Sequence, residues 1–496
     1  MSITGRCSGL PIRGHPCKAL PKCRLPTARL PAMLETRPIF DAMHAASRHA
    51  PMPDWATRAD RLRRLRALVM DNRAAIAAAI SADFSNRPQQ ETELAEVFPS
   101  VAGIAHALRH GKRWMRVRRR ATGLWFKPAA SKLMPQPLGV VGIVVPWNYP
   151  LMLAVGPLTA ALAAGNRVML KQSEYTPRFA ALFAQLIGAS FAADEIAVVN
   201  GDAEVAREFS SLPFDHLLFT GSTAVGRHVM RAASEHLTPV TLELGGKSPA
   251  IVGPEADFDK AVERILVGKL LNAGQTCIAP DYVLLPADKV QRFIDTAKRV
   301  FGKLYPDLAG NPDYTSIVSA QHFARLQALA DEAGHLGALA VPLSDSVSDA
   351  VSRRMSPLLL SGVNDGMRVM QEEIFGPLLP LLPYGSLEQA IAYVNAHPRP
   401  LALYLFEKNR ANIDQVMRNT VAGGVSINDT LLHIAQDDLP FGGVGASGMG
   451  AYHGEYGFQT LSKMKPIFHQ SAINGLSLFK PPYGKTFQMM MKLLVR

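Results

Sequence analysis

The stretch LGVVGIVVPWNYP, residues 138–150, decides the fold class of this chain. Its apolar run Val140–Val145 has the length of a buried strand and ends at a turn that contains Trp147 and Asn148. An apolar segment with the length of a helix follows the turn. A strand, a polar turn and a helix in this order begin a unit in which helices cover a parallel sheet.

The same region could be mistaken for a membrane span, because residues 133–166 contain no charged side chain. Pro146, Pro150 and Pro157 interrupt it, and proline inside a helix removes a backbone hydrogen bond. A strand, a turn and a buried helix explain the stretch better, so the sequence predicts no stable membrane span.

Short apolar runs and amphipathic segments alternate after this stretch. Strands separated by helices of this length form right-handed βαβ units and a parallel sheet. The expected strands are Val140–Val145, Arg167–Lys171, Ile196–Val199, His216–Phe219 and Val240–Leu242, and the expected helices include Thr176–Ile187 and Val225–Ala233.

A second alternating series runs from residues 248–252 to residues 425–428 and predicts a second α/β domain. Residues 54–110 have the apolar spacing of long helices, whereas residues 125–139 and 440–475 fit neither series. With 496 residues the chain is long enough for several domains. We therefore expect an α/β protein with two Rossmann-like parallel-sheet domains and a small additional β element.

The formal net charge of +12 does not indicate a nucleic-acid-binding protein. Residues 1–34 carry basic side chains and no acidic one, and a second basic run covers residues 112–120. The first run contains no aromatic residue and the second contains one, Trp114, so neither forms the alternating basic and aromatic stripe of proteins that bind single strands. Solvated basic surfaces explain the charge better, and we expect no nucleic-acid partner.

The cysteines indicate a reducing compartment, since Cys7, Cys17 and Cys23 lie near the N-terminus and only Cys277 lies in the body. This favours a cytoplasmic protein without a disulfide framework. The spacing of the three N-terminal cysteines matches no zinc signature, so we expect no metal site.

Residues 1–35 are expected to form a disordered leader without ordered structure. They lack the apolar core of a secretory signal. A transit peptide is one interpretation, and an extension upstream of a true start at Met33 is the one that we favour.

Polar or glycine-bearing turns follow four strands of the first expected sheet, where α/β proteins bind ligands. A glycine lets the backbone approach a phosphate at a helix N-terminus, so the turns together indicate a dinucleotide crevice. The formal glycine fingerprint occurs elsewhere, at residues 443–448, without a preceding strand, and is interpreted as a turn-rich loop. The four turns are residues 146–150, 171–174, 201–202 and 219–226.

Cys277 and Glu243 are candidates for chemistry, although each has a simpler explanation. A single cysteine in the body is more often a small core residue than a nucleophile. The neighbours Gly274, which would leave room beside the sulfur, and Gln275, which is polar, argue against a dry core. Glu243 follows a strand and could equally form an ion pair with a surface lysine.

The chain resembles the aldehyde dehydrogenase superfamily across about residues 40–465. The resemblance rests on blocks that occur in the order and spacing of that family. They are PWNYP (146–150), KQSEYTP (171–177), FTGSTAVG (219–226), LELGGKSP (242–249), GQTC (274–277), EEIFGP (372–377) and PFGGVGASGMG (440–450).

The resemblance implies the oxidation of an aldehyde to a carboxylic acid with NAD(P)⁺. In this scheme Cys277 attacks the aldehyde carbon and later carries a thioester. The side-chain amide of Asn148 and the backbone N–H of Cys277 stabilise the oxyanion. Glu243 activates the water that hydrolyses the thioester.

The resemblance also implies the cofactor-binding residues. Glu174 next to the ribose hydroxyls favours NAD, because a carboxylate repels a 2′-phosphate, although the pattern also permits NADP. The implied contacts are Lys171 and Glu174 at the adenosine ribose, Ser222 at the pyrophosphate, Thr220 and Gly221 at the nicotinamide, and Glu373 and Phe375 at its ribose, with Trp147, Ser173, Gly226 and Leu244 completing the site.

Details of the blocks, such as Tyr149 in place of the usual phenylalanine, are most similar to the class 3-like branch, which acts on aromatic and fatty aldehydes. Within it the bacterial coniferyl aldehyde dehydrogenases are the most similar group, which makes an aromatic aldehyde the expected substrate and a fatty or medium-chain aldehyde the alternative. A cysteine esterase that needs no cofactor is an alternative from another class.

The family's architecture implies the domain boundaries and a homodimer. The apolar end of the tail could contact a partner subunit or a membrane, and we favour the subunit. The expected divisions are 36–124 with 140–242 for the NAD(P)-binding domain, 243–425 for the catalytic domain, 125–139 with 426–475 for an oligomerisation element, and 476–496 for a C-terminal tail.

Overall fold

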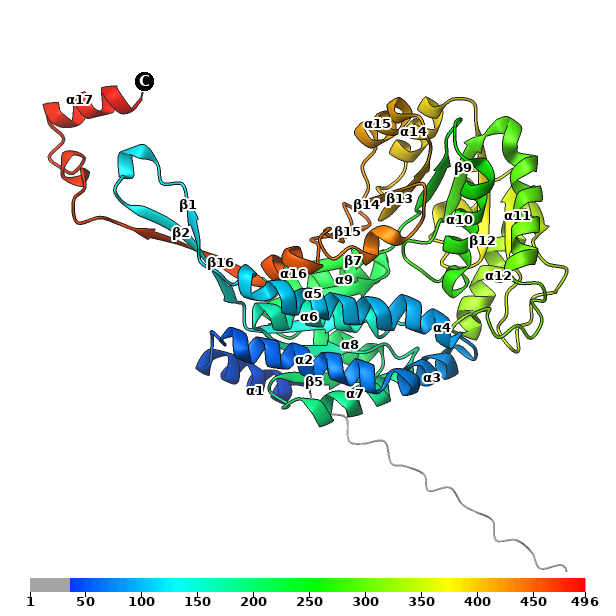
Figure 1. Cartoon of the computed structure of the whole chain (residues 1–496), viewed down its shortest axis with the longest axis horizontal. Coiled ribbons are helices and arrows are strands. Elements are labelled where there is room, and N and C mark those ends of the chain that lie inside the picture. Colours follow the sequence, from blue (N-terminus) through cyan, green and yellow to red (C-terminus); the bar gives the residue numbers. More distant parts are fainter. Residues whose placement is uncertain (1–35, 496) are drawn as a thin grey trace, which may run out of the picture. The chain divides into compact units, whose positions relative to one another are not determined.

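The computed structural model describes residues 36–495. Two large sheets and one small sheet account for its strands (Figure 1). The expectation of a leader without order over residues 1–35 lies outside the described residues. The predicted fold class, α/β with two parallel-rich sheets and a small β element, is confirmed.

The first large sheet has six strands in the order β15-β7-β6-β3-β4-β5. Its five longer strands are parallel, as predicted, and only β15 runs antiparallel, beside β7. The strands are β3 (Val140–Val144), β4 (Arg167–Lys171), β5 (Ile196–Val199), β6 (His216–Gly221), β7 (Val240–Leu244) and β15 (Gly448–Met449).

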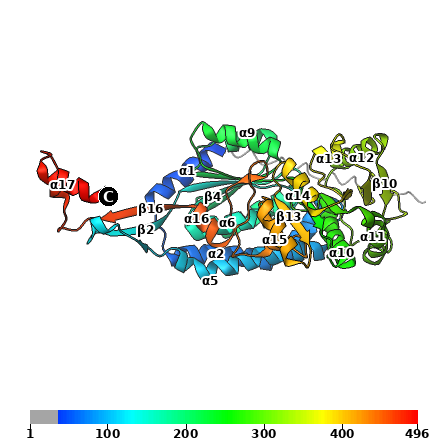
Figure 2. The same ribbon diagram turned by 90° about the horizontal axis from the view of Figure 1, so that it is seen from above.

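Helices cover both faces of this sheet (Figure 2). Helices α1 and α9 lie on one side, and α6 lies on the other, beneath an outer layer that contains α2 and α5. The helices are α1 (Thr36–His49), α2 (Trp55–Asp71), α3 (Arg73–Phe84), α4 (Gln89–Thr92), the π-helix η1 (Glu93–Val97), α5 (Phe98–Trp114), α6 (Met152–Ala164), α7 (Pro177–Ser190), α8 (Ala203–Ser210) and α9 (Thr223–Ser234).

Helix α6 explains the long uncharged stretch of the sequence. All of its residues except Gly156 are buried, because it lies between the first sheet and the outer helices. The expected buried helix is therefore confirmed, with Pro157 inside its first turns. Among residues 36–495, no helix combines the length and the apolar character that crossing a membrane requires.

The second large sheet has seven strands in the order β10-β11-β12-β9-β8-β13-β14, of which only the β10–β11 pair is antiparallel. Its strands are β8 (Pro249–Val252), β9 (Tyr282–Pro286), β10 (Leu339–Pro342), β11 (Leu358–Ser361), β12 (Leu378–Tyr384), β13 (Ala402–Phe406) and β14 (Gly424–Ile427). Its helices are α10 (Phe258–Leu270), α11 (Val290–Leu304), α12 (Ala320–His335), α13 (Arg368–Gln371), α14 (Leu387–Ala396) and α15 (Arg410–Asn419), with 3₁₀ turns η3 (Leu271–Gly274) and η4 (Ala287–Lys289).

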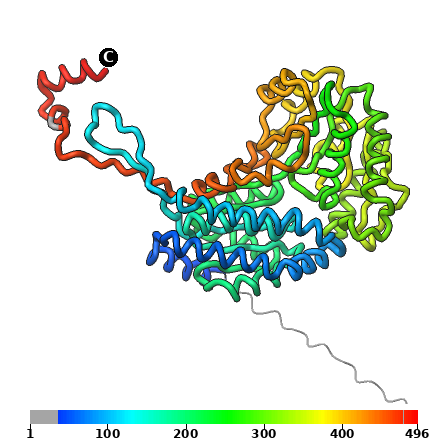
Figure 3. Tube along the Cα trace, in the orientation of Figure 1, coloured from blue at the N-terminus to red at the C-terminus, as the bar shows by residue number. Residues whose placement is uncertain are grey.

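A third, antiparallel sheet joins β1 (Arg118–Arg120), β2 (Ala130–Pro137) and β16 (Ser462–His469). The tube in Figure 3 shows β2 and β16 running together away from the helices of the first sheet. The apolar end of the chain forms α17 (Lys485–Leu494), none of whose residues is buried. The remaining short elements are 3₁₀ turns η2 (Leu124–Phe126), η5 (Leu432–Ala435) and η6 (Leu476–Leu478), and helix α16 (Gly454–Thr460).

The loop of residues 443–448 is a turn, as predicted, and not a dinucleotide fingerprint. It folds back on itself so closely that a Cβ on Gly443 would lie 2.1 Å from the carbonyl oxygen of Ser447. The turn then places Gly448 opposite Glu243 in the ladder between β15 and β7. Its glycines are therefore needed for close backbone packing beside the end of β7.

Candidate active site

A cavity of about 290 Å³ lies at the carboxyl ends of β3, β6 and β7. It brings together the three residues predicted for catalysis and seven of those predicted for cofactor binding. The walls are Pro146, Trp147, Asn148, Thr220, Gly221, Ser222, Glu243, Leu244, Gly245, Cys277, His322, Arg325, Glu373 and Phe375.

Glu243 enters this cavity from the end of β7 and is only 3% exposed. Neither carboxylate oxygen has a hydrogen-bond partner among the described residues, and the ion pair considered as its simpler explanation is not formed there. Burial raises the pKa of Glu243 well above its usual range. The side chain is therefore a carboxyl group free to exchange a proton with whatever occupies the cavity.

Cys277 follows a distorted turn at the end of α10. Asn272, Ala273 and Gly274 all adopt positive φ values, of 53°, 51° and 77°. Burial, together with the nearby carboxylates of Glu373 and Glu243, raises the pKa of the Cys277 thiol to about 12. The thiolate therefore needs a base or a neighbouring positive charge to form at neutral pH.

Asn148 lies next to the turn that carries Cys277. Its side-chain amide donates to the carbonyl oxygen of Gln275 at 3.2 Å. Its own carbonyl oxygen accepts hydrogen bonds from Arg87 at 3.0 Å and from the Asn272 side chain at 3.1 Å. The turn after β3 and the turn before Cys277 are thus fixed to each other.

A buried ion pair supports this arrangement and was missed in the sequence. Arg87 and Glu96 meet at 2.8 Å with both side chains fully buried. Glu96 also accepts from the backbone N–H groups of Leu151 and Met152, at 2.7 and 3.1 Å, where α6 begins. A charged residue within a helical pattern is normally read as surface-facing, so no sequence signal distinguished this pair.

Gln275 and Gly274 have roles other than those expected. Gln275 is fully buried and bonds the carbonyl oxygens of Asn272 and Ser316, while its own oxygen accepts from the N–H of Val318. A Cβ on Gly274 would lie 2.4 Å from the carbonyl oxygen of Gly376. Gly274 therefore permits close backbone packing against Gly376, and the expectation that it leaves room beside the sulfur stays a prediction.

The predicted residues after β6 form one wall of the cavity. The hydroxyl oxygen of Thr220 is buried without a hydrogen-bond partner among the described residues. Ser222 caps α9, accepting from the N–H of Val225 at 3.3 Å. A Cβ on Gly226 would lie 2.7 Å from the Leu244 side chain, so this glycine lets α9 approach β7. The exposed N-terminus of α9 suits a phosphate group.

Lys171, Ser173 and Glu174 follow the neighbouring strand β4 and do not line this cavity. The buried ammonium of Lys171 donates to the carbonyl oxygen of Gln172 at 2.7 Å and lies 3.9 Å from the carboxylate of Glu174. Because β4 and β6 flank β3, these residues extend the same edge of the sheet. A long ligand can therefore contact both groups.

Glu373 and Phe375 lie in the loop between α13 and β12. Burial raises the pKa of Glu373 to about 8, and its Oε1 atom has no partner among the described residues. The Phe375 ring packs against that of Trp147, with centroids 5.3 Å apart. Arg325 donates to the carbonyl oxygens of Glu373 and Ile374 and holds this loop in place.

Lys269 is a second charged residue that the sequence analysis missed. It lies on α10, is 2% exposed, and its ammonium has no hydrogen-bond partner among the described residues. Burial lowers its pKa to about 8, and the carboxylates of Asp281 and Glu373 oppose that shift. The cavity itself is lined by Glu243, Cys277 and Glu373, whose pKa values burial raises, and a concentration of shifted groups is typical of an active site.

The cavity combines a thiol, a free carboxyl group and an amide with a sheet edge that fits a dinucleotide. The orphaned hydroxyl of Thr220 and the open end of α9 leave polar groups unpartnered at this edge. No group of His, Cys, Asp and Glu residues within 36–495 could hold a metal ion.

Comparisons with known proteins agree with this chemistry. The model of the aldehyde dehydrogenase family matches residues 32–467. A probable coniferyl aldehyde dehydrogenase of Pseudomonas aeruginosa is 53% identical over 459 residues, which cover 92% of this chain and 96% of that protein. The coniferyl aldehyde dehydrogenase of Pseudomonas sp. strain HR199 is 47% identical over 92% of this chain and 95% of its own length.

Solved structures of aldehyde dehydrogenases also superpose on this chain. The substrate-bound AldH of Staphylococcus aureus superposes with a TM-score of 0.87 at 37% identity, over 92% of this chain and 99% of that one. A betaine aldehyde dehydrogenase from Staphylococcus aureus, in complex with NAD⁺, gives a TM-score of 0.79 at 26% identity, with 89% of each chain covered. This chain belongs to the aldehyde dehydrogenase family and is an NAD(P)-dependent aldehyde dehydrogenase.

Proposed function

We propose that the chain oxidises an aromatic aldehyde of the coniferyl aldehyde type, with Cys277 as nucleophile, Glu243 as general base and Asn148 as oxyanion donor. The observation that carries the assignment is the shared cavity, in which the Cys277 thiol, the unpartnered Glu243 carboxyl group and the Asn148 amide meet. The substrate class is supported by relatives of this name at 53% and 47% identity.

The reaction begins when the sulfur of Cys277 adds to the aldehyde carbon and forms a thiohemiacetal. The side-chain amide of Asn148 uses one N–H for the carbonyl oxygen of Gln275, which leaves the second for the developing oxyanion. One such donor contributes about 3 kcal/mol to the transition state. The nicotinamide ring, when bound, brings a positive charge that favours the thiolate and accepts the hydride of the thiohemiacetal.

Glu243 acts after the oxidation step. The unpartnered oxygens of Glu243 can accept a proton from a water molecule that attacks the thioester of Cys277. The carboxylic acid then leaves and the thiol is regenerated. The raised pKa of Glu243 makes it a stronger base than an exposed glutamate, and its ionised fraction increases with pH.

The residues at the carboxyl end of β4 support NAD as the preferred cofactor. Glu174 is half-exposed and lies 3.9 Å from the Lys171 ammonium, where ribose hydroxyls would contact both groups. A 2′-phosphate would meet the negative charge of Glu174. The lysine would still attract that phosphate, so NADP is used less well and is not rejected.

A homodimer is proposed from the small sheet. Leu124, Trp125 and Phe126 precede β2 and are 57–73% exposed, and the Phe468 ring of β16 packs edge-on against Phe126. An apolar group of this kind on one chain suits burial against a second copy.

The test is NADH formation from 4-hydroxy-3-methoxycinnamaldehyde, an aliphatic aldehyde of similar length and NAD⁺, with wild type and Cys277→Ala. The proposal predicts that the aromatic substrate has the higher kcat/KM and that the variant forms no NADH. Higher kcat/KM for the aliphatic aldehyde would overturn the substrate class. Turnover by Cys277→Ala would overturn the nucleophile.

A further inference from the structure

A second cavity lies at the amino ends of β3 and β4, whereas the active-site cavity lies at the carboxyl ends of β3, β6 and β7. The two cavities share no residue. The second one has a volume of about 220 Å³, and we name it the arginine pocket after Arg48 of α1, Arg61 of α2 and Arg167 of β4, which line it. It is therefore separate from the site proposed for the reaction.

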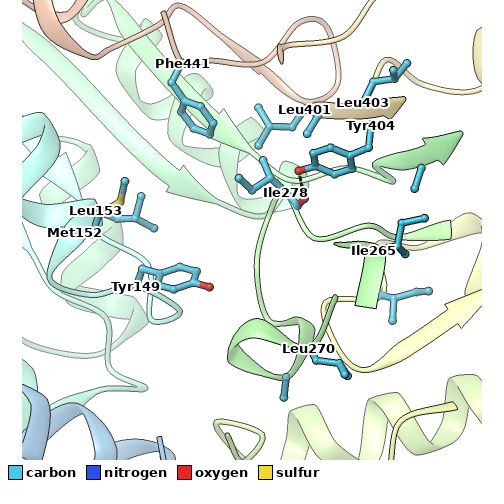
Figure 4. Packing of buried hydrophobic residues seen from close by; sticks show 14 of the residues in the cluster. Tyr149, Met152, Leu153, Ile265, Leu270, Ile278, Leu401, Leu403, Tyr404 and Phe441 are labelled. Carbon is cyan, nitrogen blue, oxygen red and sulfur yellow. Dashed lines mark hydrogen bonds between the residues drawn. The ribbon is translucent and has the colours of Figure 1, made fainter. Parts of the chain in front are cut away.

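Different segments border the two ends of β3. After its carboxyl end, Tyr149 shares a hydrogen bond of 2.6 Å with the hydroxyl of Thr276. Figure 4 shows the Tyr149 hydroxyl directed at the loop between Leu270 and Ile278. At the amino end, α1, α2 and the link between them form walls of the arginine pocket. The loop that carries Cys277 therefore contacts one edge of the sheet, and the pocket belongs to the other.

The lining of the pocket is positively charged. It contains three arginines and, among the described residues, no aspartate or glutamate. The carboxylates that pair with two of these arginines lie outside the lining, with Asp215 at 3.0 Å from Arg48 and Asp194 at 2.7 Å from Arg167. An anion inside the pocket would therefore meet guanidinium groups without a carboxylate beside them in the wall.

Arg61 is the most buried of the three arginines, at 6% exposed. Its Nε atom donates to the carboxylate of Glu195 at 2.9 Å, and its two terminal nitrogens make no hydrogen bond to any described residue. Glu195 is shared, because Arg64 also donates to it at 3.0 and 3.1 Å. Buried donors are normally paired, so the terminal nitrogens of Arg61 indicate an acceptor that enters the pocket from outside the chain.

Arg58 adds a further positive charge behind the wall of the pocket. It is 1% exposed, and it donates to the backbone carbonyl oxygens of Pro53, Ala163 and Ala164 at 2.6–3.1 Å. Its Nη2 atom has no partner among the described residues. The guanidinium lies over Gly165, which lines the pocket, and a Cβ on that glycine would lie 2.7 Å from Cζ. Because Arg58 bonds carbonyl oxygens and not a carboxylate, its charge adds to that of the three lining arginines.

The charge and the size of the pocket suit a phosphoryl group. The planar fork of a guanidinium matches two oxygens of a phosphate, and several guanidiniums suit a group with two negative charges. A carboxylate offers one charge and two oxygens, so it would use fewer of the donors. The volume of about 220 Å³ is below the roughly 300–1,000 Å³ of pockets for drug-sized ligands, which favours a small ligand.

We propose that the arginine pocket binds a phosphoryl group, either of free phosphate or of a small phosphate monoester, with Arg61 as its anchor and Arg48 and Arg167 as further donors. The bound group bridges α1, α2 and the start of β4. It binds at the edge of the sheet opposite the reaction, so the site does not depend on which aldehyde the enzyme oxidises.

The test is calorimetric titration of the full-length enzyme with inorganic phosphate, glycerol 3-phosphate and acetate at constant ionic strength. Saturating NAD⁺ is present, so that phosphate does not bind at the N-terminus of α9. We expect a Kd below about 1 mM for at least one phosphate compound and at least tenfold weaker binding of acetate. Arg61→Gln should weaken the binding about tenfold or more, because it removes charge-assisted donors. Arg63→Gln, at an exposed arginine of α2 outside the pocket, is the matched control and should bind as wild type does.

Tighter binding of glycerol 3-phosphate would identify a monoester as the ligand, and tighter binding of phosphate would identify the free ion; both results support the site. The proposal is overturned if wild type binds neither compound, if acetate binds as tightly, or if the Kd of Arg61→Gln stays within threefold of wild type. Should Arg61→Gln fail to fold, Arg48→Gln decides, because the Arg48 side chain is 58% exposed. A threefold or larger increase of its Kd supports the site, and a smaller one overturns it.

Discussion

The active-site cavity and the arginine pocket are built from different kinds of sequence. The cavity is lined by turns at strand ends, where short blocks such as residues 146–150 and 219–226 carry their chemistry together. The pocket is lined by single arginines from two helices and one strand, of which Arg48 and Arg167 lie far apart in the chain. The residues proposed for the reaction therefore lie in short blocks of the sequence. The proposed phosphoryl site depends on how segments that are distant in the sequence pack together.

Burial favours the uncharged form of the titratable groups in both regions. In the cavity, burial raises the pKa of Glu373 to about 8 and that of Glu243 well above its usual range. Beside the pocket, burial and the charge of Arg61 lower the pKa of Arg58 to about 10, so this guanidinium is still charged at neutral pH. At neutral pH the cavity therefore holds protonated carboxyl groups, whereas the pocket keeps its positive charge.

The largest predicted effect comes from the ion pair that supports the cavity. Arg87 bonds the carbonyl oxygen of Asn148, and its partner Glu96 bonds the N–H of Met152 at the start of α6. Arg87→Met leaves Glu96 buried without its partner and should lower the free energy of unfolding by about 3–5 kcal/mol. Chemical denaturation measures this change.

The double variant Arg87→Met/Glu96→Gln is the control for that prediction. It removes both charges, so it should recover much of the stability lost in Arg87→Met. Equal stability of Arg87→Met and wild type would show that the pair does not stabilise this part of the fold.

The next effect is confined to the cavity. Asn148→Ala removes the oxyanion donor and should lower kcat about 10²–10³-fold. The binding of inorganic phosphate should stay as in wild type, because the arginine pocket shares no residue with the cavity. Steady-state kinetics and the phosphate titration check this, and a kcat within threefold of wild type would refute the assignment.

A smaller effect is expected at the outer part of the sheet edge. Glu174→Gln removes the carboxylate that we propose to lie at the ribose, and should raise kcat/KM for NADP relative to NAD about tenfold. Glu204→Gln, at an exposed glutamate on α8, is the matched control and should leave the ratio unchanged. If Glu174→Gln leaves the ratio of kcat/KM for NADP and NAD unchanged, residues other than Glu174 select the cofactor.

The smallest effect concerns stability in acid. Burial lowers the pKa of His216 to about 4 from its usual 6.5, so the unfolded chain binds a proton that the folded chain refuses. Stability is therefore lost as the pH falls from 6.5 to 4. His216→Asn should lower the number of protons taken up on unfolding by about one between pH 6.5 and 4. The pH dependence of the free energy of unfolding, from denaturation at several pH values, measures this number. His228→Asn, at an exposed histidine, should leave it unchanged.

The sequence was most informative where local chemistry decides the structure. The strands β3 to β7 followed from apolar runs bounded by turns, and the same turns supplied Asn148, Thr220 and Glu243. The burial of Arg87, in the loop between α3 and α4, and of Glu96, in η1, could not be predicted, because it depends on how these segments pack against the start of α6.

The arginine pocket could not be predicted from the sequence for a related reason. Arg48 and Arg61 are ordinary residues in helical patterns until α1 and α2 are placed beside the amino ends of β3 and β4. Lys269 on α10 is likewise buried, and the charges of Asp281 and Glu373 act on its ammonium. Such sites arise from tertiary packing, which a single sequence does not reveal.

The division of work between Cys277 and Glu243 is tested most directly by rapid mixing of Glu243→Gln with NAD⁺ and 4-hydroxycinnamaldehyde. Our account predicts a burst of NADH close to one per active site at the wild-type rate. Steady-state turnover should then be about 10²–10⁴-fold slower, because the thioester on Cys277 is not hydrolysed. A missing burst, or continued turnover at the wild-type rate, would contradict the role of Glu243 as the base that releases the acid.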